Sequence, residues 1–470
     1  MVVIKSKPET LKSKFSDGDI RYLEAFSHVI GYSIEYDNEI KIEFNPDRPD
    51  LFSFPSLIRA IKSYYDRDFV LRSLLEKDNT DIYIEKEALY IRPYFYSFSA
   101  IGSQIGKFLP DLIDFQEKIH EVVGKNRSKV SIGIHDLENI NPPFHYKVAC
   151  TDLIFETYDG FRGKVSEILK KHSKGIEFSH LLGNNDKVTL ITDSNDDVLS
   201  MPPIINGSKS KLSENTKKFF IDLTGTDSKS VIDAFYLLKN FFESLNYRIY
   251  LNRINGIADN FEDKLLAHNW RKIRISRSEV KKISGSEMNI EDMIISLRRM
   301  GYVAEPSENG IIVYVPGQRV DVMGPVDVVE DIIKAVGLEN IQEQELPIGL
   351  SGVPSKNADF LEHSRDVMIG LGYQEVMSFV LSERIYEDEY SGGVKLENPK
   401  SDDFSVIRDR LFPNLIMLLK SNKNRPLPQK IFEIGETIEN AVQHTKLCAM
   451  LSNNRATYSD IRGILDSYIQ

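Results

Sequence analysis

Residues 201–227, MPPIINGSKSKLSENTKKFFIDLTGTD, constrain the fold more than any other stretch of this chain. Pro202 and Pro203 fix φ near its extended value and lack amide donors, so we expect the chain to run straight here rather than helically. Phe220, Ile221 and Leu223 then supply apolar strand residues around Asp222, Thr224 and Thr226, and Gly225 permits a turn. We therefore predict a strand whose end gathers small oxygen-bearing side chains.

An amphipathic helix is predicted directly after this strand. Thr226 or Asp227 can cap it, because a side-chain oxygen there accepts hydrogen bonds from first-turn amides. Apolar residues then recur at helical spacing, at Val231, Phe235, Leu238, Phe242 and Leu245. Two interpretations of the polar strand end stay open: an ordinary hairpin edge with a helix cap, or a pocket for a polar substrate group.

Composition limits the class of protein. With 470 residues, 41% of them hydrophobic, the chain is long enough to bury several cores. A net charge of -11 argues against a general binder of polyanions, because nonspecific nucleic-acid affinity needs Lys and Arg to neutralise phosphates. Cys150 and Cys448 are too far apart in sequence to indicate a disulfide framework or a zinc site. No signal peptide or membrane-length apolar run occurs, so we expect a cytoplasmic protein.

Changes in periodicity predict four mixed α and β domains, over residues 1–75, 76–268, 269–342 and 343–470. In the first domain we expect a helix over 19–31, a hairpin turning at Asp37 and Asn38, and a helix over 54–65. In the second, strand-like runs surround a helix expected over 109–123. Each of these two domains should therefore be of the α+β class.

The last two domains have different patterns. Between 270 and 341 the order is strand, helix, hairpin and helix, in RKIRIS, EDMIISLRRMGY, GIIVYVPGQRVDV and DVVEDIIKAVG. Beyond it we expect a helix over 360–371, a strand at EVMSFVLS, a helix after Pro413 and a strand at QKIFEIG. No P-loop, dinucleotide-binding glycine motif, zinc-protease motif or serine-hydrolase elbow occurs, so the sequence carries no signature of those activities.

Two further groups of side chains could carry chemistry. Asp321, Asp327, Glu330 and Asp331 form an acidic cluster. The last three share one helix face and could hold Mg²⁺ through hard oxygen ligands. The alternative is structural, because first-turn carboxylates cap a helix and favour its dipole. His135, in KVSIGIHDL, could act as a ligand or base, but no second ligand stands at metal spacing, so we expect a structural role.

Taken in order, eight motifs resemble the beta-subunit family of phenylalanine–tRNA ligase, in its archaeal and eukaryotic-like form. They are NPDRPDLFS, KVSIGIHDL, MPPIIN, TKKFFIDLTGTD, RVDVMGPVDVVEDI, VMSFVLS, LENPKSDDFSVIRDRLFPNLI and QKIFEIGE. Each could recur by chance, whereas eight in the family's order span nearly the whole chain. The resemblance implies a heterotetramer of two alpha and two beta subunits that charges tRNA(Phe). The alpha subunit would hold ATP, phenylalanine and the aminoacylation site.

By the same resemblance, the fold is multidomain α+β. Residues 76–268 would form a tRNA-editing domain, and 269–342 a small helix-turn-helix-like domain associated with a metal. Residues 343–470 would form a class II synthetase-like antiparallel sheet that lacks the ATP motifs and packs against the alpha subunit. The residues that match the family's Mg²⁺ positions are Asp321, Asp327, Glu330 and Asp331.

The editing domain of this family hydrolyses tyrosine mistakenly esterified to tRNA(Phe). A second site is needed because an apolar pocket for phenylalanine rejects an isostere that adds only a hydroxyl by roughly 10². The residues expected to line it are Asn206, Asp222, Thr224 and Thr226, with Ser200 and Pro203 shaping its entrance. No activated Ser or Cys nucleophile is evident, so we expect an attacking water held by these polar groups and by the substrate's ribose.

The sequence departs from the family pattern at two places. Residues 207 and 208 read Gly-Ser, where the family often has Ser directly after Asn, so we expect this loop to sit differently. The chain ends at Gln470, where family members usually continue, so we expect a shortened or incomplete last domain. Two other functions stay open: a noncatalytic tRNA-binding scaffold that has lost editing, and a free-standing editing hydrolase that works without an alpha subunit.

Overall fold

The computed structural model describes residues 2–66, 69, 75–183, 187–256, 261–341, 343, 349, 351–382 and 393–469. Residues 1–345 form one compact unit and residues 346–470 a second. Residues 1, 342 and 470, at which predicted domains begin or end, lie outside the described residues. The mixed α+β class is confirmed. One hydrophobic core runs through the three domains predicted in the first unit, which explains why they cluster together, and the division into three stays a prediction.

The N-terminal part combines a small sheet with four helices. Strands β1 (Val2–Ser6), β3 (Ile40–Phe44) and β2 (Ser33–Tyr36) pair antiparallel in that order. The helices are α1 (Pro8–Lys14), α2 (Asp17–Ile20), α3 (Leu23–Ile30) and α4 (Phe54–Tyr65). The predicted hairpin and the helix over 54–65 are confirmed. The helix predicted over 19–31 is interrupted, because the chain turns at Arg21 and Tyr22.

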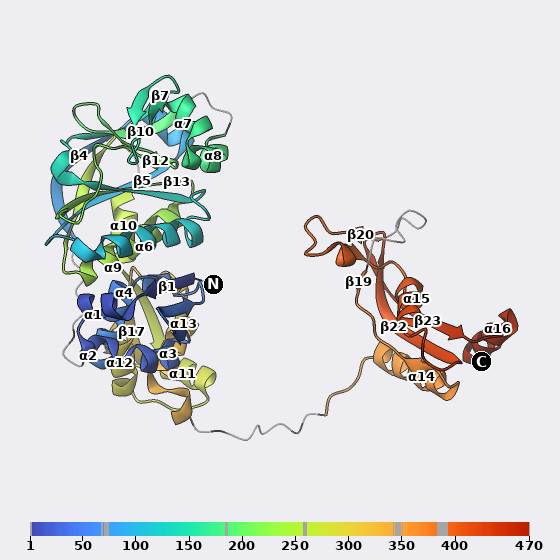
Figure 1. The fold of residues 1–470 in the computed structure, drawn as a ribbon. Helices are drawn as coiled ribbons and strands as arrows, with labels where there is room; N and C mark the ends of the chain where they lie inside the picture. Colours follow the sequence, from blue (N-terminus) through green and yellow to red (C-terminus); the bar gives the residue numbers. More distant parts are fainter. Residues whose placement is uncertain are drawn as a thin grey trace. The chain divides into compact units, whose positions relative to one another are not determined.

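A nine-stranded sheet forms the middle of the first unit (Figure 1). Its strands, in spatial order, are β12 (Ile205–Asn206), β11 (Val198–Met201), β10 (Lys187–Thr192), β7 (Phe144–Cys150), β4 (Glu76–Ile84), β14 (Arg248–Asn255), β5 (Tyr94–Ile101), β13 (Lys218–Gly225) and β6 (Val130–Asp136). The strand predicted around Asp222 is β13. It pairs with β5 on one side and β6 on the other, so the interpretation of this strand as a hairpin edge is wrong.

Helices cover both faces of this sheet (Figure 1). On one face lie α6 (Leu109–Val122) and α9 (Ser228–Ser244), and α10 (Phe261–Asn269) packs against α9. On the other lie α7 (Val165–Lys171) and α8 (Ser173–Phe178). The remaining elements of this region are α5 (Lys86–Ile91) and the two-stranded pair of β8 (Ile154–Glu156) and β9 (Arg162–Lys164). The helix predicted after β13 is α9, and Asp227 caps it by accepting a 2.9 Å hydrogen bond from the amide of Ser230.

The two prolines do not extend the chain as predicted. Residues 202–204 form a turn that joins β11 to β12, and the bond between Pro202 and Pro203 is cis. The two strands pair antiparallel, with Met201 opposite Ile205. Pairing of the strands on either side therefore bends the segment, although proline itself favours extended backbone.

The last part of the first unit contains a three-stranded sheet and three helices. Its elements are β15 (Trp270–Ser276), α11 (Arg277–Ser284), α12 (Ile290–Arg299), β16 (Val303–Ser307), β17 (Gly310–Pro316) and α13 (Pro325–Val336). The strand order is β15-β17-β16, with antiparallel pairing throughout. The predicted hairpin partner is wrong: β17 pairs with the preceding β16, whereas residues 317–322 form no strand.

The second unit is built on a long hairpin. Its elements are α14 (Lys356–Gly370), β18 (Gln374–Glu375), β19 (Leu381–Ser382), β20 (Val394–Lys395), β21 (Val406–Ile407), α15 (Phe412–Ser421), β22 (Gln429–Glu439), β23 (Val442–Ser452) and α16 (Tyr458–Ile469). The strand predicted at EVMSFVLS is present only at its two ends, in β18 and β19. The expected antiparallel sheet is mixed in its described part, because β18 runs parallel to β22.

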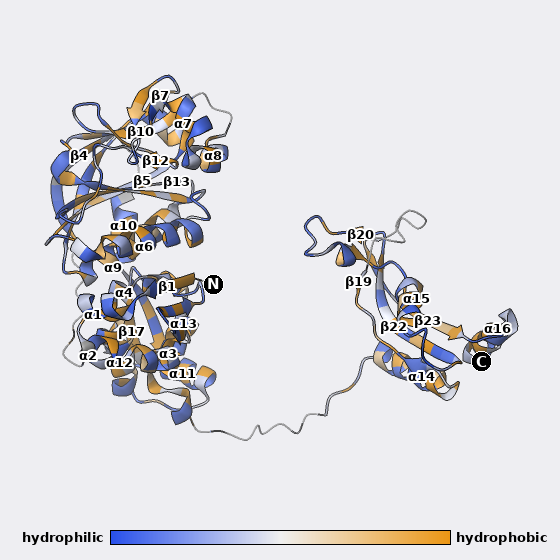
Figure 2. Ribbon diagram, in the orientation of Figure 1, coloured by the Kyte–Doolittle hydropathy of each residue, from blue (hydrophilic) through white to orange (hydrophobic). Residues whose placement is uncertain are grey.

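Both units place apolar residues on one side of their elements and polar residues on the other. Figure 2 shows hydrophilic and hydrophobic residues alternating along the helices of both units, as amphipathic packing requires. Among the described residues, no helix is long and apolar enough to cross a membrane. The apolar helix faces of the first unit pack into its hydrophobic core.

Candidate functional site

A cavity of about 330 Å³ lies in the first unit, between α6, β6, β13 and the turn from β11 to β12. Four of the six residues predicted for editing line it: Ser200, Pro203, Asn206 and Asp222. Apolar side chains, including Ile132, Met201 and Ile204, form much of the remaining wall. Small-ligand sites are typically apolar hollows of roughly 300–1,000 Å³ with a few placed polar groups, so this cavity has the size and lining of one.

Asp222 is the buried acid of this cavity. Its side chain is 1% exposed, and its Oδ2 accepts a 2.8 Å hydrogen bond from Nε2 of His135. The hydroxyl of Ser200 lies 3.5 Å from the same oxygen. Its Oδ1 is buried and has no hydrogen-bond partner among the residues that the structure describes. A buried carboxylate oxygen without a donor is costly, so this atom is suited to accept a hydrogen bond from a ligand.

Thr224 and Thr226, also predicted to line the site, do not reach the cavity. Thr224 accepts two hydrogen bonds from Arg92. Nε donates to its hydroxyl oxygen at 3.1 Å, and Nη2 donates to its carbonyl oxygen. Burial lowers the pKa of the Arg92 guanidinium to about 10, against the opposing influence of Tyr146 and Asp222. The hydroxyl of Thr226 donates to the carbonyl of Ser128 instead. The Thr224 hydroxyl, which the sequence analysis assigned to the substrate pocket, is therefore hydrogen-bonded to Arg92.

Sequence reasoning missed Arg127, which is buried beside the cavity. Its Nη1 donates to the carbonyl of Ile204 at 3.0 Å, within the proline turn. Its Nη2 pairs with Glu117 of α6 at 2.8 Å, and its guanidinium lies 4.5 Å from the ring centre of Phe178. The side chain therefore ties the turn to α6. No local sequence signal identifies it, because its partners are distant along the chain.

Two glycines make room for the cavity's polar groups. A Cβ on Gly133 would lie 2.0 Å from Oδ2 of Asp222 and 2.7 Å from Nε2 of His135. A Cβ on Gly207 would lie 2.0 Å from the carbonyl oxygen of Val198. A residue with a Cβ at position 207 would require a shift of the backbone, because the loop approaches β11 closely here.

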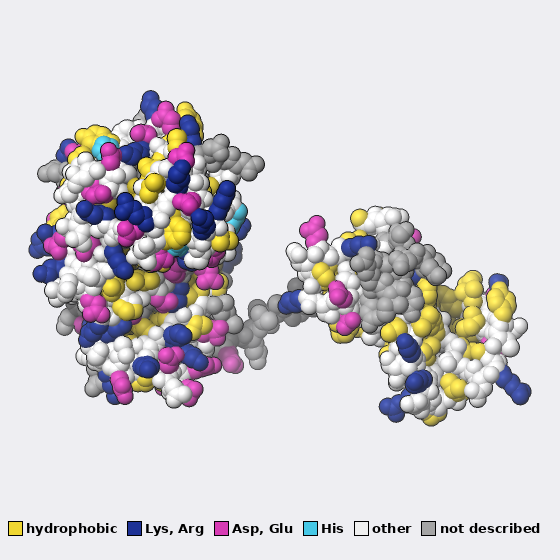
Figure 3. All heavy atoms as spheres, turned by 45° about the horizontal axis from the view of Figure 1, so that its top comes forward, with side chains coloured by type: hydrophobic (Ala, Val, Ile, Leu, Met, Phe, Trp, Pro, Cys, Tyr) yellow, Lys and Arg dark blue, Asp and Glu magenta, His cyan; other side chains and the backbone are white. Residues whose placement is uncertain are grey.

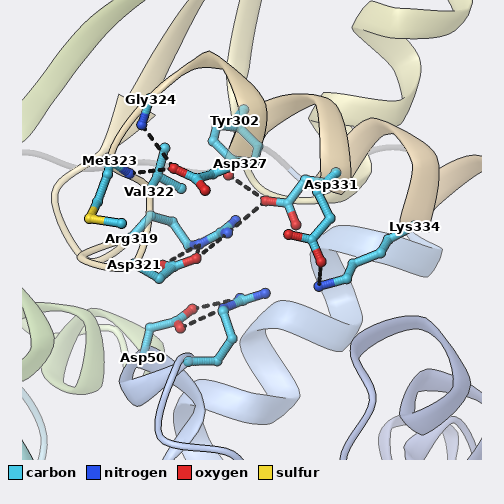
Figure 4. A network of polar contacts seen from close by, with 12 residues as sticks. Asp50, Tyr302, Arg319, Asp321, Val322, Met323, Gly324, Asp327, Asp331 and Lys334 are labelled. Carbon is cyan, nitrogen blue, oxygen red and sulfur yellow. Dashed lines mark hydrogen bonds and ion pairs between the residues drawn. The ribbon is translucent and has the colours of Figure 1, made fainter. Parts of the chain in front are cut away.

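The acidic cluster is organised around Arg319 (Figure 4). The buried guanidinium makes ion pairs of 2.6 Å with both Asp321 and Asp331. Asp331 also accepts a hydrogen bond from the hydroxyl of Tyr302. Burial would raise the pKa of Asp321, but the charge and hydrogen bonds of Arg319 outweigh it and lower this pKa to about 2. Two of the four predicted metal ligands are therefore ion-paired to one arginine.

The other two acids have separate partners. Asp327 accepts hydrogen bonds from the amides of Met323 and Gly324 at the start of α13, as the structural alternative predicted (Figure 4). Glu330 pairs with Lys334 one turn along the helix, at 2.8 Å. Across the described parts of the chain, no group of three His, Cys, Asp or Glu residues is placed to hold a metal ion. The arrangement of these four acids does not fit Mg²⁺, because each already has a cationic or amide partner.

Three family models match this chain. The "B3/4 domain" matches residues 110–242, which contain the cavity. The "tRNA synthetase B5 domain" matches residues 273–338, and the "Phenylalanyl tRNA synthetase beta chain CLM domain" matches residues 343–470. The matches follow one another in the order of the motifs along the sequence.

Whole-chain relatives agree with these matches. The phenylalanine–tRNA ligase beta subunits of Thermoplasma volcanium and Thermoplasma acidophilum are 47% and 44% identical over 470 residues, covering 100% of this chain and 88% and 87% of their own lengths. A crystal structure of an N-terminal fragment of the phenylalanyl-tRNA synthetase beta subunit from Pyrococcus horikoshii is similar, with 26% identity and a TM-score of 0.62. It covers 71% of this chain and 99% of the fragment. Since the similarity to the Thermoplasma proteins extends along its whole length, the chain belongs to the archaeal-type beta-subunit family of phenylalanine–tRNA ligase.

Proposed function

We propose that the cavity beside Asp222 hydrolyses tyrosine that has been attached in error to tRNA(Phe). The observation that carries the proposal is Asp222, which lines a cavity with largely apolar walls and whose buried Oδ1 lacks a partner among the described residues. A tyrosyl side chain would place its ring against those walls and donate its hydroxyl to this oxygen. Family membership supports the same function, because the matched B3/4 domain contains the cavity.

The selectivity of such a site has a physical basis. A site built to hydrogen-bond a substrate hydroxyl rejects the analogue that lacks it by about 10⁴–10⁵, because the buried acceptor is then left unpaired. Phenylalanine would leave Oδ1 of Asp222 without a donor, whereas tyrosine would satisfy it. The cavity therefore favours the amino acid that the synthetic site rejects poorly.

The hydrolysis itself needs a water molecule and a place for the leaving group. In this proposal water attacks the ester carbonyl carbon, the bond to the terminal ribose oxygen breaks, and that oxygen leaves with a proton. Among the polar residues that line the cavity, we assign Ser200 and Asn206 to orient the water together with the substrate's ribose. Thr224 and Thr226 have no part in it, because both lie away from the cavity.

The variant Asp222→Asn tests this function in the ligase assembled with its alpha subunit. An amide keeps the size of the side chain but removes the charge that strengthens the bond to the tyrosyl hydroxyl. We expect hydrolysis of tyrosyl-tRNA(Phe) to slow by roughly 10- to 100-fold, the value of one hydrogen bond to a charged group. The rate of phenylalanine attachment should not change.

Thr226→Val is the matched control, because its hydroxyl bonds to the Ser128 carbonyl at the surface, outside the cavity. This variant should hydrolyse tyrosyl-tRNA(Phe) at the normal rate. Unchanged hydrolysis by Asp222→Asn would reject the cavity as the editing site. Hydrolysis by the chain without an alpha subunit would favour the free-standing hydrolase, and loss of hydrolysis in every preparation would favour the scaffold.

The same proposal assigns assembly to the second unit. As a beta subunit, the chain has an alpha partner, and we place ATP, phenylalanine and the charging of tRNA(Phe) on that subunit, in a cytoplasmic heterotetramer of two alpha and two beta subunits. Figure 3 shows hydrophobic side chains on the surface of the second unit. Met377 is 95% exposed and Phe379 76% exposed, so this unit presents apolar area that a partner could cover.

Magnesium has no step in this proposal. The family resemblance implies it at the four acids of the 321–331 segment, but Arg319 holds Asp321 and Asp331. An ion at these carboxylates would have to displace the guanidinium first.

A further inference from the structure

His135 is fully buried and uses both ring nitrogens. Its Nε2 lies 2.8 Å from Oδ2 of Asp222, and its Nδ1 lies 2.6 Å from the hydroxyl oxygen of Ser210. An ionised carboxylate can only accept hydrogen bonds, so Nε2 carries a proton and donates it. In the neutral ring Nδ1 then accepts from the Ser210 hydroxyl. The three side chains form a directed row from Ser210 through His135 to Asp222.

The backbone is shaped to hold this row. His135 lies on β6 and Asp222 on the paired strand β13, where Gly133 is opposite Asp222. Any residue with a Cβ at position 133 would overlap both the carboxylate and the imidazole. Burying a histidine and a carboxylate costs free energy unless every polar atom is paired. Here all are paired except Oδ1 of Asp222, the oxygen proposed above for the tyrosyl hydroxyl.

The hydrogen bond from His135 also limits the orientation of Oδ1 of Asp222. The terminal torsion of an aspartate is soft and roughly two-fold, so a carboxylate without a fixed partner can turn away from a ligand. The His135 bond holds Oδ2, and the weaker 3.5 Å contact of Ser200 falls on the same atom. With Oδ2 fixed, Oδ1 has a single position in which it can accept.

We infer that His135 is a positioning residue for editing, which fixes Asp222 so that Oδ1 reads the tyrosyl hydroxyl, while Ser210 fixes the imidazole. This inference rests on the proposed function. It differs from the sequence-based expectation that His135 is only structural. Its effect should appear in the preference for tyrosine over phenylalanine rather than in the overall rate.

Two variants of His135 separate positioning from simple packing. The amide nitrogen of glutamine can stand where Nε2 stands and donate to Asp222, whereas the amide of asparagine reaches only the position of Nδ1. Hydrolysis of tyrosyl-tRNA(Phe) and of phenylalanyl-tRNA(Phe) is measured as kcat/KM in the assembled ligase. The ratio of the two values is the readout.

We expect His135→Asn to lower the tyrosine-to-phenylalanine ratio at least tenfold, and His135→Gln to keep most of it. An unchanged ratio in His135→Asn would overturn the inference, and so would an equal loss in both variants. If His135→Asn does not fold, Ser210→Ala decides the question: a lower ratio supports positioning through the ring, and an unchanged ratio rejects it.

Asp222→Asn in the same assay separates failure of the proposed function from failure of the positioning role of His135. If Asp222→Asn hydrolyses tyrosyl-tRNA(Phe) normally, the proposed function itself fails. If that variant is impaired while the His135 ratio is unchanged, only the positioning role fails.

Discussion

A large effect of a single side chain on stability is expected at Arg319. Its buried guanidinium is the cation for both Asp321 and Asp331. In Arg319→Met the buried Asp331 and the partly buried Asp321 lose that cation, and breaking a buried pair in this way costs about 3–5 kcal/mol. Urea unfolding of the purified chain measures the change in free energy.

Lys334→Met is the matched control for this variant. Lys334 makes an ion pair with Glu330 at the helix surface, where Glu330 is 61% exposed. Exposed pairs of this spacing contribute about 0.3–0.5 kcal/mol, so the control should unfold nearly as the unchanged chain does. Equal losses in both variants would contradict the buried network.

For single residues, the sequence predicted which side chains are important more accurately than it predicted their contacts. Asp222 and Asn206 lie at the cavity, whereas Thr224 is bonded to Arg92, 132 positions away in the chain. The spacing of the acids was compatible with a metal site and with a helix cap. It gave no account of the ion pairs that Arg319 makes with Asp321 and Asp331.

Among the elements, α9 offers a direct test of a helix cap. Asp227 accepts hydrogen bonds from the amide and the hydroxyl of Ser230, at 2.9 and 2.6 Å. Asp227→Ala should lower the free energy of unfolding by about 1 kcal/mol, because the first turn loses its acceptor. Asp227→Asn should lose much less, since an amide oxygen also caps. Urea unfolding at neutral pH compares the two.

The cap should also depend on pH. Hydrogen bonds from Ser230 lower the pKa of Asp227 below its usual 3.8. The unfolded chain therefore binds the proton first as the pH falls, so the cap's contribution is full above 3.8 and is lost below it. The stability difference between the unchanged chain and Asp227→Asn should shrink over that range. A constant difference would show that the carboxylate charge has no role in the cap.

Elements with a strong local period were predicted well. The helix over 54–65, the strand around Asp222 and the capped helix after it all formed. Two of the errors fell where strand pairing decides the course of the backbone. The proline turn bends because β11 and β12 pair, and β17 pairs with the strand before it rather than with the residues after it.

For the whole molecule, the two units should unfold separately. The first unit has an extensive core, whereas the core cluster of the second has three buried residues, Met368, Tyr373 and Phe432. The single tryptophan is Trp270 of β15, so its fluorescence reports on the first unit alone. Urea unfolding followed by fluorescence should give a higher midpoint than unfolding followed by far-UV circular dichroism, which detects both units.

Residues 1–345 produced alone provide the control for this experiment. In that fragment the two signals should coincide, because only the first unit is present. The fragment should also fail to capture an alpha subunit that the full chain captures, if the second unit carries the assembly surface. Coincident curves for the full chain would mean that the two units unfold as one.

The sequence by itself determined the α+β class, the order of most helices and strands, and the family, because these depend on local periodicity and on motifs in series. Only the tertiary structure decided which polar groups meet. His135 and Asp222 are 87 positions apart and are neighbours because β6 and β13 pair in one register, with Gly133 leaving space between them. The physical reason is that a hydrogen bond depends on distances of a few ångströms in space, and strand register fixes these distances where sequence spacing does not.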